Sequence, residues 1–199
     1  MRSVLKIPRI YLFLQYIAGG MSARRQMLED YASVRPGFRV LDIGCGPGYV
    51  ASYLTDCTYV GFDINERYIK YAQKYYGNRH AFHCQPFDSQ QVQYLEKFDL
   101  VLMNGLIHHL PDSQAYELVK LSRDALKPNG LLLTLDGCYH EGQSIIARYL
   151  LDKDRGDYVR EAGAYRKLTE SVFDQVQIFI RSDFSRVPYT YIVMKCANV

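Results

Sequence analysis

The chain of 199 residues lacks tryptophan, a strong net charge and any apolar run long enough to cross a membrane. The net charge is only +3 and the basic residues are dispersed, whereas nucleic-acid-binding surfaces gather Lys and Arg on one side. A transmembrane helix needs about 20 apolar residues, and the apolar stretch that starts at Ile10 is soon interrupted by Gln15. We therefore expect neither a nucleic-acid partner nor a membrane span.

Disulfide and zinc signatures are also missing. The chain has five cysteines, an odd number, and none forms a Cys-x-x-Cys pair. A disulfide framework uses an even set at regular spacing, and a zinc site needs clustered ligands. The cysteines are therefore predicted to be reduced thiols in a cytoplasmic protein, with no bound metal: Cys45, Cys57, Cys84, Cys138 and Cys196.

The first 20 residues place basic residues, an apolar stretch and small residues in the order of a signal peptide. Four apolar residues in this segment recur at the spacing of one helix face: Ile10, Phe13, Leu14 and Ile17. We favour an amphipathic N-terminal helix. A cleaved signal or a helix on a membrane surface is the alternative.

Strand and helix patterns alternate after Pro36-Gly37, which predicts βαβ units and a parallel sheet with helices on both faces. The tail differs, since two β segments at 172–180 and 189–195 read as an antiparallel hairpin joined around 185–188. We predict an α/β fold with a doubly wound, seven-stranded, mostly parallel sheet that ends in this hairpin. The five parallel strands are expected at 38–43, 58–62, 81–84, 98–103 and 131–135, and the main helices at 22–33, 66–76 and 112–126, with Asp112 as an N-cap.

The whole chain, 1–199, is expected to be one domain because no linker divides it. Helices over 1–35 precede the first strand. A mostly helical insert over 136–171, rich in tyrosine and charge, is the expected substrate region.

A glycine loop gives the strongest local signal: Val40-Leu41-Asp42-Ile43-Gly44-Cys45-Gly46-Pro47-Gly48. Ligands bind outside the carboxyl ends of parallel strands, and Asp42 stands there with a carboxylate that orders the loop or meets a ligand cation. The spacing is G-x-G-x-G, not the G-x-G-x-x-G of dinucleotide sites, and Pro47 removes an N–H that a phosphate would need. The loop thus suits a ligand without a pyrophosphate. A tight turn with no ligand is the alternative.

Two acids follow the next strands. Asp63 ends the second strand, about 20 residues after the loop, where an acid accepts hydrogen bonds from ribose hydroxyls. It could instead cap the helix that starts near Glu66. After the third strand, Phe87 is a candidate to lie on a purine face, and Asp88 to accept from an exocyclic amine or to cap a helix near Gln91.

The fourth strand leads into Asn104-Gly105-Leu106-Ile107-His108-His109. Asn104 and Gly105 are expected beside the glycine loop. Adjacent histidines do not share one face, and no matching acid or cysteine cluster is evident in the sequence, which disfavours a metal site. One histidine is a candidate hydrogen-bonding or substrate-orienting group, and a packed or helix-capping role is the alternative.

Together these residues resemble the class I S-adenosylmethionine-dependent methyltransferases, in the branch of small-molecule enzymes. The string Leu41 to Gly48 is similar to the family's first motif, and Tyr59-Val60-Gly61-Phe62-Asp63-Ile64 to its second strand. The fourth-strand motif matches Phe98 to Val101 with Ile107 to Leu110, and the turn before the fifth strand matches Leu126 to Leu131. The resemblance covers about 38–135 and implies a Rossmann-like fold.

The resemblance also implies roles for single residues. Gly44 and Cys45, with Gly46 in the same loop, would contact the methionine part of S-adenosylmethionine, and Asp63 would hold its ribose. Ile64 would pack on one face of the adenine. Phe87 and Asp88 would hold the other face of the adenine and its exocyclic amine. The chain has Gln85-Pro86 where the family often has Gly-Asp. Backbone groups near Asn104 would take the cofactor's amino group.

Methyl transfer from a sulfonium needs an in-line nucleophile, and a general base only where the acceptor starts protonated. His109 is the first candidate base, followed by Tyr139 and His140. The candidates to line the acceptor site are Tyr11, Tyr16, Tyr139 and Tyr165. A small-molecule or lipid-like acceptor is expected because no recognition domain is appended. The absence of an Asn/Asp-Pro-Pro-aromatic run disfavours nucleobase amines. The alternatives are a catalytically silent cofactor-binding or interaction protein and, less favoured, an NAD-dependent oxidoreductase.

Overall fold

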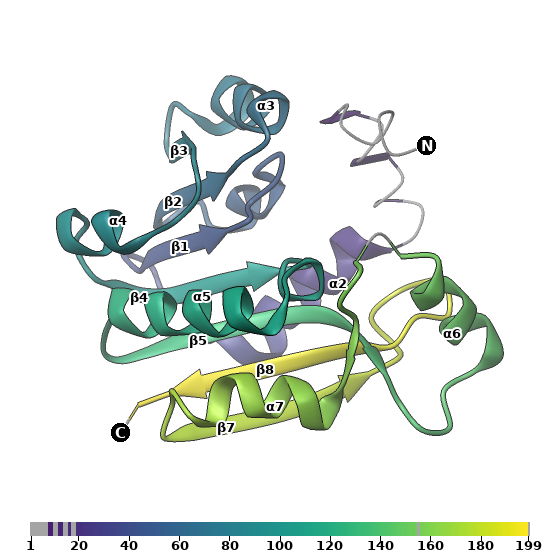
Figure 1. Ribbon diagram of the computed structural model, residues 1–199. Coiled ribbons are helices and arrows are strands. Elements are labelled where there is room, and N and C mark those ends of the chain that lie inside the picture. The colour runs from purple at the N-terminus through teal and green to yellow at the C-terminus, as the bar shows by residue number, and fades with distance from the viewer. Residues whose placement is uncertain (1–7, 10–11, 14–15, 17–18, 155, 199) are drawn as a thin grey trace.

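The computed structural model describes residues 8–9, 12–13, 16, 19–154 and 156–198, and Figure 1 shows their arrangement around one twisted sheet. The sheet order is β3-β2-β1-β4-β5-β8-β7, with the short β6 beside β5. The strands are β1 Arg39–Ile43, β2 Thr58–Asp63, β3 Ala81–Cys84, β4 Phe98–Asn104, β5 Leu126–Tyr139, β6 Arg160–Glu161, β7 Gln175–Arg181 and β8 Tyr191–Ala197.

Strands β1 to β5 pair in parallel, whereas β8 runs antiparallel to both β5 and β7. The mostly parallel sheet with a final hairpin is thus confirmed, and the two-residue β6 adds to the seven strands expected. The hairpin starts later than predicted, because Val172 and Phe173 close the preceding helix through backbone bonds to Thr169. Its connection spans 182–190, which is longer than the expected turn.

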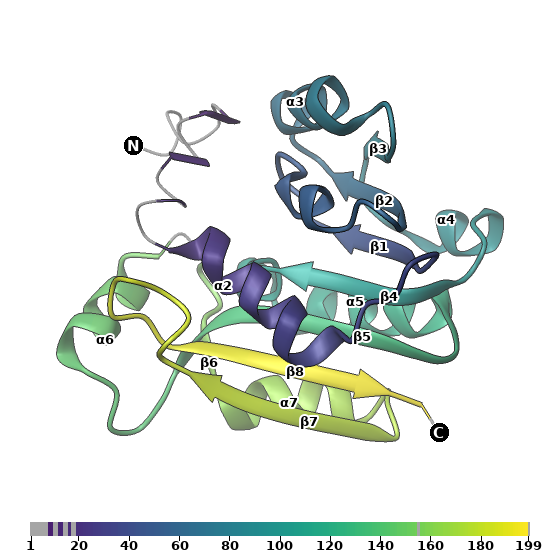
Figure 2. The ribbon, with the colours of Figure 1, turned by 180° about the vertical axis from the view of Figure 1, so that it is seen from behind.

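Helices cover both faces of the sheet, as Figures 1 and 2 show from opposite sides. Helices α2 and α3 pack their buried residues on one face, and α5 and α7 on the other, so each face has its own apolar core. The helices are α2 Gly20–Met27, α3 Glu66–Tyr76, α4 Ser89–Tyr94, α5 Asp112–Ala125, α6 Ile145–Asp152 and α7 Ala162–Glu170, and a π turn, Leu28–Ala32, extends α2.

Helix α5 corrects one expectation. Its N-cap is Pro111, and Asp112 is the first helical residue. The Asp112 carboxylate accepts two hydrogen bonds from Arg160, at 2.8 and 2.7 Å. The Asp112 side chain therefore forms a long-range ion pair instead of the local N-cap that the sequence predicted.

Strand β5 is longer than expected, since it takes in the turn sequence at 127–130. Asn129 has a φ of +62°, and the pairing with β4 shifts register between Phe98 and Leu100. The turn residues thus form an irregularity within the strand instead of a separate turn. The strand then continues past Asp136 to Tyr139, which carries these residues to the carboxyl edge of the sheet.

Much of the predicted N-terminal helix lies outside the described residues, including Ile10, Leu14 and Ile17. Two of its aromatic residues are described, and Phe13 and Tyr16 are both exposed. Among the described residues, none of the helices has the length and apolar character required to cross a membrane.

Gly48 sets how closely the glycine loop packs on the sheet. Its φ is +74°, and a Cβ there would lie 2.7 Å from the Phe82 ring and 2.8 Å from the Ala72 Cβ. We expect Gly48→Ala to lower the free energy of unfolding by about 2–3 kcal/mol, from overpacking and a disfavoured backbone conformation together. Urea unfolding followed by circular dichroism measures this loss.

Gly163 is the matched control, because it lies in α7 and a Cβ added to it would meet no atom within 4 Å. Gly163→Ala is expected to leave stability unchanged or raise it by up to about 1 kcal/mol, since alanine favours the helix. Equal losses in the two variants would contradict the packing role assigned to Gly48.

Candidate functional site

The glycine loop connects β1 to a 3₁₀ turn, Tyr49–Tyr53, and its N–H groups donate hydrogen bonds within the protein. The N–H groups of Gly44 and Cys45 both donate to the Phe62 carbonyl oxygen, at 2.8 and 3.0 Å. The Gly46 N–H donates to Asp63 Oδ2 at 2.9 Å, and the Gly48 N–H donates to the Cys45 carbonyl at 3.1 Å. Pro47 has no N–H.

This pattern decides what kind of ligand the loop suits. A phosphate cradle needs free backbone N–H groups, usually at the start of a helix. Here the N–H groups of 44–48 are already used, and the turn that follows is too short to carry a helix dipole. The loop therefore suits a ligand that carries no phosphate, as the glycine spacing predicted.

Asp63 ends β2 and connects two segments. Besides the Gly46 N–H, its carboxylate accepts the Asn65 N–H at 2.7 Å through Oδ1. Asn65, not Asp63, is the N-cap of α3, because its side chain accepts from the Arg67 N–H. Burial raises the pKa of Asp63, and the two backbone hydrogen bonds oppose that rise. Each carboxylate oxygen has a further lone pair for a ligand hydroxyl.

Ile64 follows directly and is 77% exposed. An apolar side chain this exposed at the edge of a ligand-binding sheet is available to cover a flat apolar ligand. The sequence placed Asp63 and Ile64 together on the ligand side, and the structure brings both next to the glycine loop.

Buried polar atoms gather at the ends of β1 and β4. Asp42 is 1% exposed and accepts a hydrogen bond from the Tyr59 hydroxyl at 2.6 Å through Oδ2. Its Oδ1 has no partner among the described residues, and the same holds for both side-chain amide atoms of Asn104. Buried polar groups are normally satisfied, and exceptions in a native structure call for a water, an ion or a ligand.

Arg24 was missed by sequence reasoning. It belongs to α2, yet its Nη2 would lie 3.3 Å from a Cβ placed on Gly105, so the guanidinium reaches the end of β4. Its charge also opposes the rise in the pKa of Asp42, which burial brings to about 7. The sequence held no signal for this contact, because it joins residues 81 positions apart through the packing of α2 on the sheet.

Phe87 and Asp88 occupy structural positions. Phe87 is 5% exposed and packs edge to face on Phe62, with ring centroids 5.3 Å apart. This corrects the expectation that its ring lies on a purine, since the ring faces the core. Asp88 caps α4 in a reciprocal capping box with Gln91, which is the alternative that the sequence left open.

The candidate bases lie near the exit of β4 and the end of β5. His109 and His140 are exposed. The Tyr139 hydroxyl donates to Asp152 at 2.8 Å. Tyr165 is fully buried and donates to the Gly137 carbonyl at 2.9 Å, so the expectation that it lines an acceptor site is wrong. Tyr11 lies outside the described residues.

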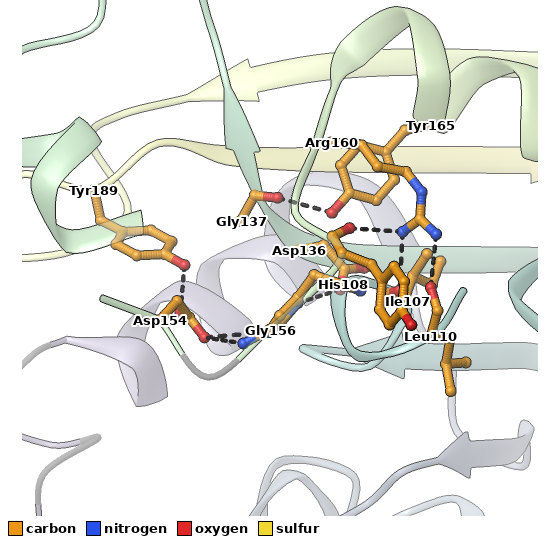
Figure 3. A network of polar contacts seen from close by, with 11 residues as sticks. Ile107, His108, Leu110, Asp136, Gly137, Asp154, Gly156, Arg160, Tyr165 and Tyr189 are labelled. Carbon is orange, nitrogen blue, oxygen red and sulfur yellow. Dashed lines mark hydrogen bonds and ion pairs between the residues drawn. The ribbon is translucent and has the colours of Figure 1, made fainter. Parts of the chain in front are cut away.

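A buried polar network surrounds His108, as Figure 3 shows. Its Nδ1 lies 2.7 Å from Asp136 and its Nε2 lies 3.5 Å from Asp154. Burial alone would lower the pKa of His108, but hydrogen bonds to the two carboxylates outweigh it and raise the pKa to about 9. His108 is therefore an imidazolium at neutral pH and cannot act as a base.

The two carboxylates correct the expectation that no acids accompany the histidines. They were hidden in the sequence because Asp136 and Asp154 lie 28 and 46 residues after His108. Across the part of the chain that the structure describes, no three potential ligands form a group suited to a metal ion.

The sequence of this sheet and loop matches a family model. Residues 40–130 match the model described as a methyltransferase domain. This stretch contains the glycine loop, Asp63 and the exit loop of β4, so the match falls on the geometry described above. The match covers less than half of the chain, and over this stretch the chain is similar to a methyltransferase domain.

Two curated relatives and one solved structure illustrate this similarity. Over 186 residues the chain is 26% identical to phosphoethanolamine N-methyltransferase 3 of Arabidopsis thaliana, covering 90% of this chain and 37% of that one. Over 126 residues it is 29% identical to the cyclopropane-fatty-acyl-phospholipid synthase of Escherichia coli K12, covering 59% of this chain and 31% of that one. The chain thus spans less than two fifths of these relatives' lengths.

The solved structure shares the methyltransferase fold. It is the magnesium protoporphyrin IX methyltransferase of Synechocystis PCC 6803 with bound S-adenosylhomocysteine. Its TM-score to this chain is 0.66 at 19% identity, over 94% of this chain and 87% of that one.

Asp42 gives a stability prediction for this protein. Its raised pKa means that the fold disfavours the carboxylate, so its destabilising effect grows as the pH rises from the unfolded value near 4 through about 7. We expect Asp42→Asn to raise the free energy of unfolding by roughly 1–3 kcal/mol at pH 8 and to change it little at pH 4.5. Thermal unfolding across this pH range measures the difference. A variant that is less stable at pH 8 would contradict the assignment.

Proposed function

We propose that this protein binds S-adenosylmethionine at the carboxyl edge of β1, β2 and β4 and transfers its methyl group to a small-molecule or lipid-like acceptor. One observation carries the proposal: the glycine loop has used its N–H groups internally, while Asp63 keeps lone pairs beside it. A loop and an acid in this arrangement suit a nucleoside without phosphate. The same observation disfavours an NAD-dependent oxidoreductase.

The residues fit the chemical parts of the cofactor. Asp63 accepts the ribose hydroxyls, and exposed Ile64 packs on the adenine. At the other end, the cofactor's ammonium group finds acceptors in Asp42 Oδ1 and in the Asn104 amide oxygen. Asn104 also has an amide N–H₂ to donate. Because Gly105 has no side chain, Arg24 can come close. Its guanidinium supplies the positive charge that the cofactor's carboxylate needs.

S-adenosylmethionine supplies a methyl group that its sulfonium has already activated. The protein then has to hold an acceptor atom in line with that methyl and to exclude water. The exit loop of β4 and the insert over 136–171 lie at this edge and provide the acceptor side. His109 remains the predicted base where the acceptor carries a proton, with Tyr139 and His140 behind it.

The acceptor class rests on the relatives' names, which mention phosphoethanolamine and a fatty-acyl phospholipid. Both suggest small or lipid-like molecules and not nucleic acid. We retain the prediction of a cytoplasmic enzyme, which rests on free cysteines. A catalytically silent binding protein is the alternative. Such a protein would bind the cofactor but transfer no labelled methyl group to any acceptor.

Removal of the Asp63 carboxylate tests ribose binding. We expect Asp63→Ala to weaken S-adenosylhomocysteine binding by about 10- to 100-fold in calorimetry, because two ribose hydrogen bonds are lost. Asp56→Asn is the matched control, since Asp56 is an exposed acid at the opposite edge of the same strand pair. Equal affinities of Asp63→Ala and the wild type would overturn the ribose assignment. Binding of NAD in place of the sulfur nucleosides would overturn the function.

Arg24 gives a prediction that separates the two ends of the cofactor. We expect Arg24→Gln to weaken S-adenosylhomocysteine binding by about 10- to 100-fold, because the carboxylate loses its cation. Binding of 5′-methylthioadenosine, which lacks the amino-acid part, should change by less than about twofold. Calorimetry with both ligands measures the contrast.

Arg25→Gln is the neighbouring control, because Arg25 is exposed and pairs with Glu29 at 2.8 Å. It should bind both ligands like the wild type. If Arg24→Gln weakened both ligands equally, Arg24 would hold the shape of the site and not the carboxylate.

A further inference from the structure

His108 lies where three parts of the chain meet: the exit loop of β4, the end of β5, and residues 154 and 156–161 between α6 and α7. Its backbone N–H and its Nδ1 both face Asp136 Oδ1, at 3.2 and 2.7 Å. Its Nε2 faces Asp154 at 3.5 Å. The ring thus connects a carboxylate of the sheet to a carboxylate of the insert.

The insert follows the exit loop closely at this point. The Tyr158 N–H donates to the His108 carbonyl at 3.0 Å. Gly156 packs directly on the His108 ring, where any Cβ would clash with it. Asp154 is held from its other side, because it accepts the Tyr189 hydroxyl at 2.7 Å and the Gly156 N–H at 3.2 Å. Figure 3 shows Asp154 between Tyr189 and the histidine segment.

Arg160 holds the end of the same segment. Its guanidinium donates to the carbonyl oxygens of Ile107 and Leu110, at 3.1 and 2.6 Å, and to Asp112 at 2.7 Å. This guanidinium charge is permanent. Of the two cations that hold the insert on the exit loop, only His108 can lose its proton near physiological pH.

We propose that His108 is a positioning residue whose imidazolium holds residues 154 and 156–161 of the insert on the exit loop of β4 and so fixes the acceptor wall of the site. The role of this wall rests on the proposed methyl transfer, whereas the clamp itself is a property of the contacts. His108 acts through Asp154 and Tyr158, and it touches no reacting atom. This assigns the two adjacent histidines different tasks, since exposed His109 is left for the acceptor.

The charged and titratable groups around His108 define its response to pH. They come from every element packed on it: Asp136 of β5, Asp154 and Tyr189 of the connections, Arg160 of β6, Tyr165 of α7, the adjacent His109 and, across Gly105, Arg24. The pKa of His108 is raised to about 9, and the pKa of Asp154 is lowered by the same pair. The clamp is therefore complete below the unfolded pKa near 6.5, and it weakens as the pH rises through about 9.

Nuclear magnetic resonance on the full chain tests the clamp. In the wild type at pH 7.5, both His108 ring nitrogens should be protonated, with a titration midpoint near 9. Hydrogen exchange of the Tyr158 amide reports the clamp, because this amide donates to His108. In His108→Gln, its protection factor should fall by about tenfold at pH 7.5, as expected when a charge-assisted bond is lost.

Asp154→Asn provides a second route, because it removes the insert's carboxylate and leaves the histidine in place. It should lower Tyr158 protection by a similar factor even where His108→Gln folds poorly. His140→Gln is the control, since His140 is an exposed histidine that lies outside the segment. In the wild type, protection should also fall as the pH passes 9, and this step should be absent from both clamp variants.

Two outcomes would overturn the proposal: a neutral His108 at pH 7.5, or unchanged Tyr158 protection in both clamp variants. Titration of the wild type with S-adenosylhomocysteine in the same samples tests the proposed function separately. Failure of that binding with an intact clamp would refute the cofactor assignment alone. Normal binding of S-adenosylhomocysteine together with either overturning outcome would refute only the positioning role of His108.

Discussion

The shape of the glycine loop depends on the hydrogen bonds that it makes to the last two residues of β2. The Phe62 carbonyl takes the N–H groups of Gly44 and Cys45, and the Asp63 carboxylate takes the N–H of Gly46. These bonds turn the loop's donors inward. They also fix the position of the Asp63 carboxylate. The residue proposed to hold the ribose is therefore positioned by the glycine loop, whose shape it helps to set.

The exit loop of β4 connects the two halves of the site. On the side of α2 lie the buried polar side chains of Asp42 and Asn104 and the guanidinium of Arg24, which we propose bind the amino-acid part of the cofactor. On the side of α5 and α7, Asp136, His108 and Asp154 hold the insert. Gly105 lies between these halves, with Arg24 and His108 both near its missing Cβ. In the proposed function, the cofactor and the acceptor would therefore meet at this short segment.

Local sequence signals predicted most of the fold and the positions of the glycine loop and of Asp63. The glycine spacing, the acid after β2 and the helix at 66–76 depend on nearby residues, and the structure has them as expected. Contacts over long separations were not predictable. Arg24 reaches Gly105 through the docking of α2, and Asp154 reaches His108 through the path of the insert. Phe87 was misassigned because an aromatic residue after a strand packs equally well inward, on Phe62.

A crystal structure of the protein with S-adenosylhomocysteine tests the central claim most directly. The account predicts the ribose hydroxyls on the Asp63 carboxylate, the adenine against Ile64 and the amino-acid end between Asp42, Asn104 and Arg24, with the loop N–H groups still bound to Phe62 and Asp63. A ligand bound away from this edge, or loop N–H groups turned outward to meet it, would contradict the account.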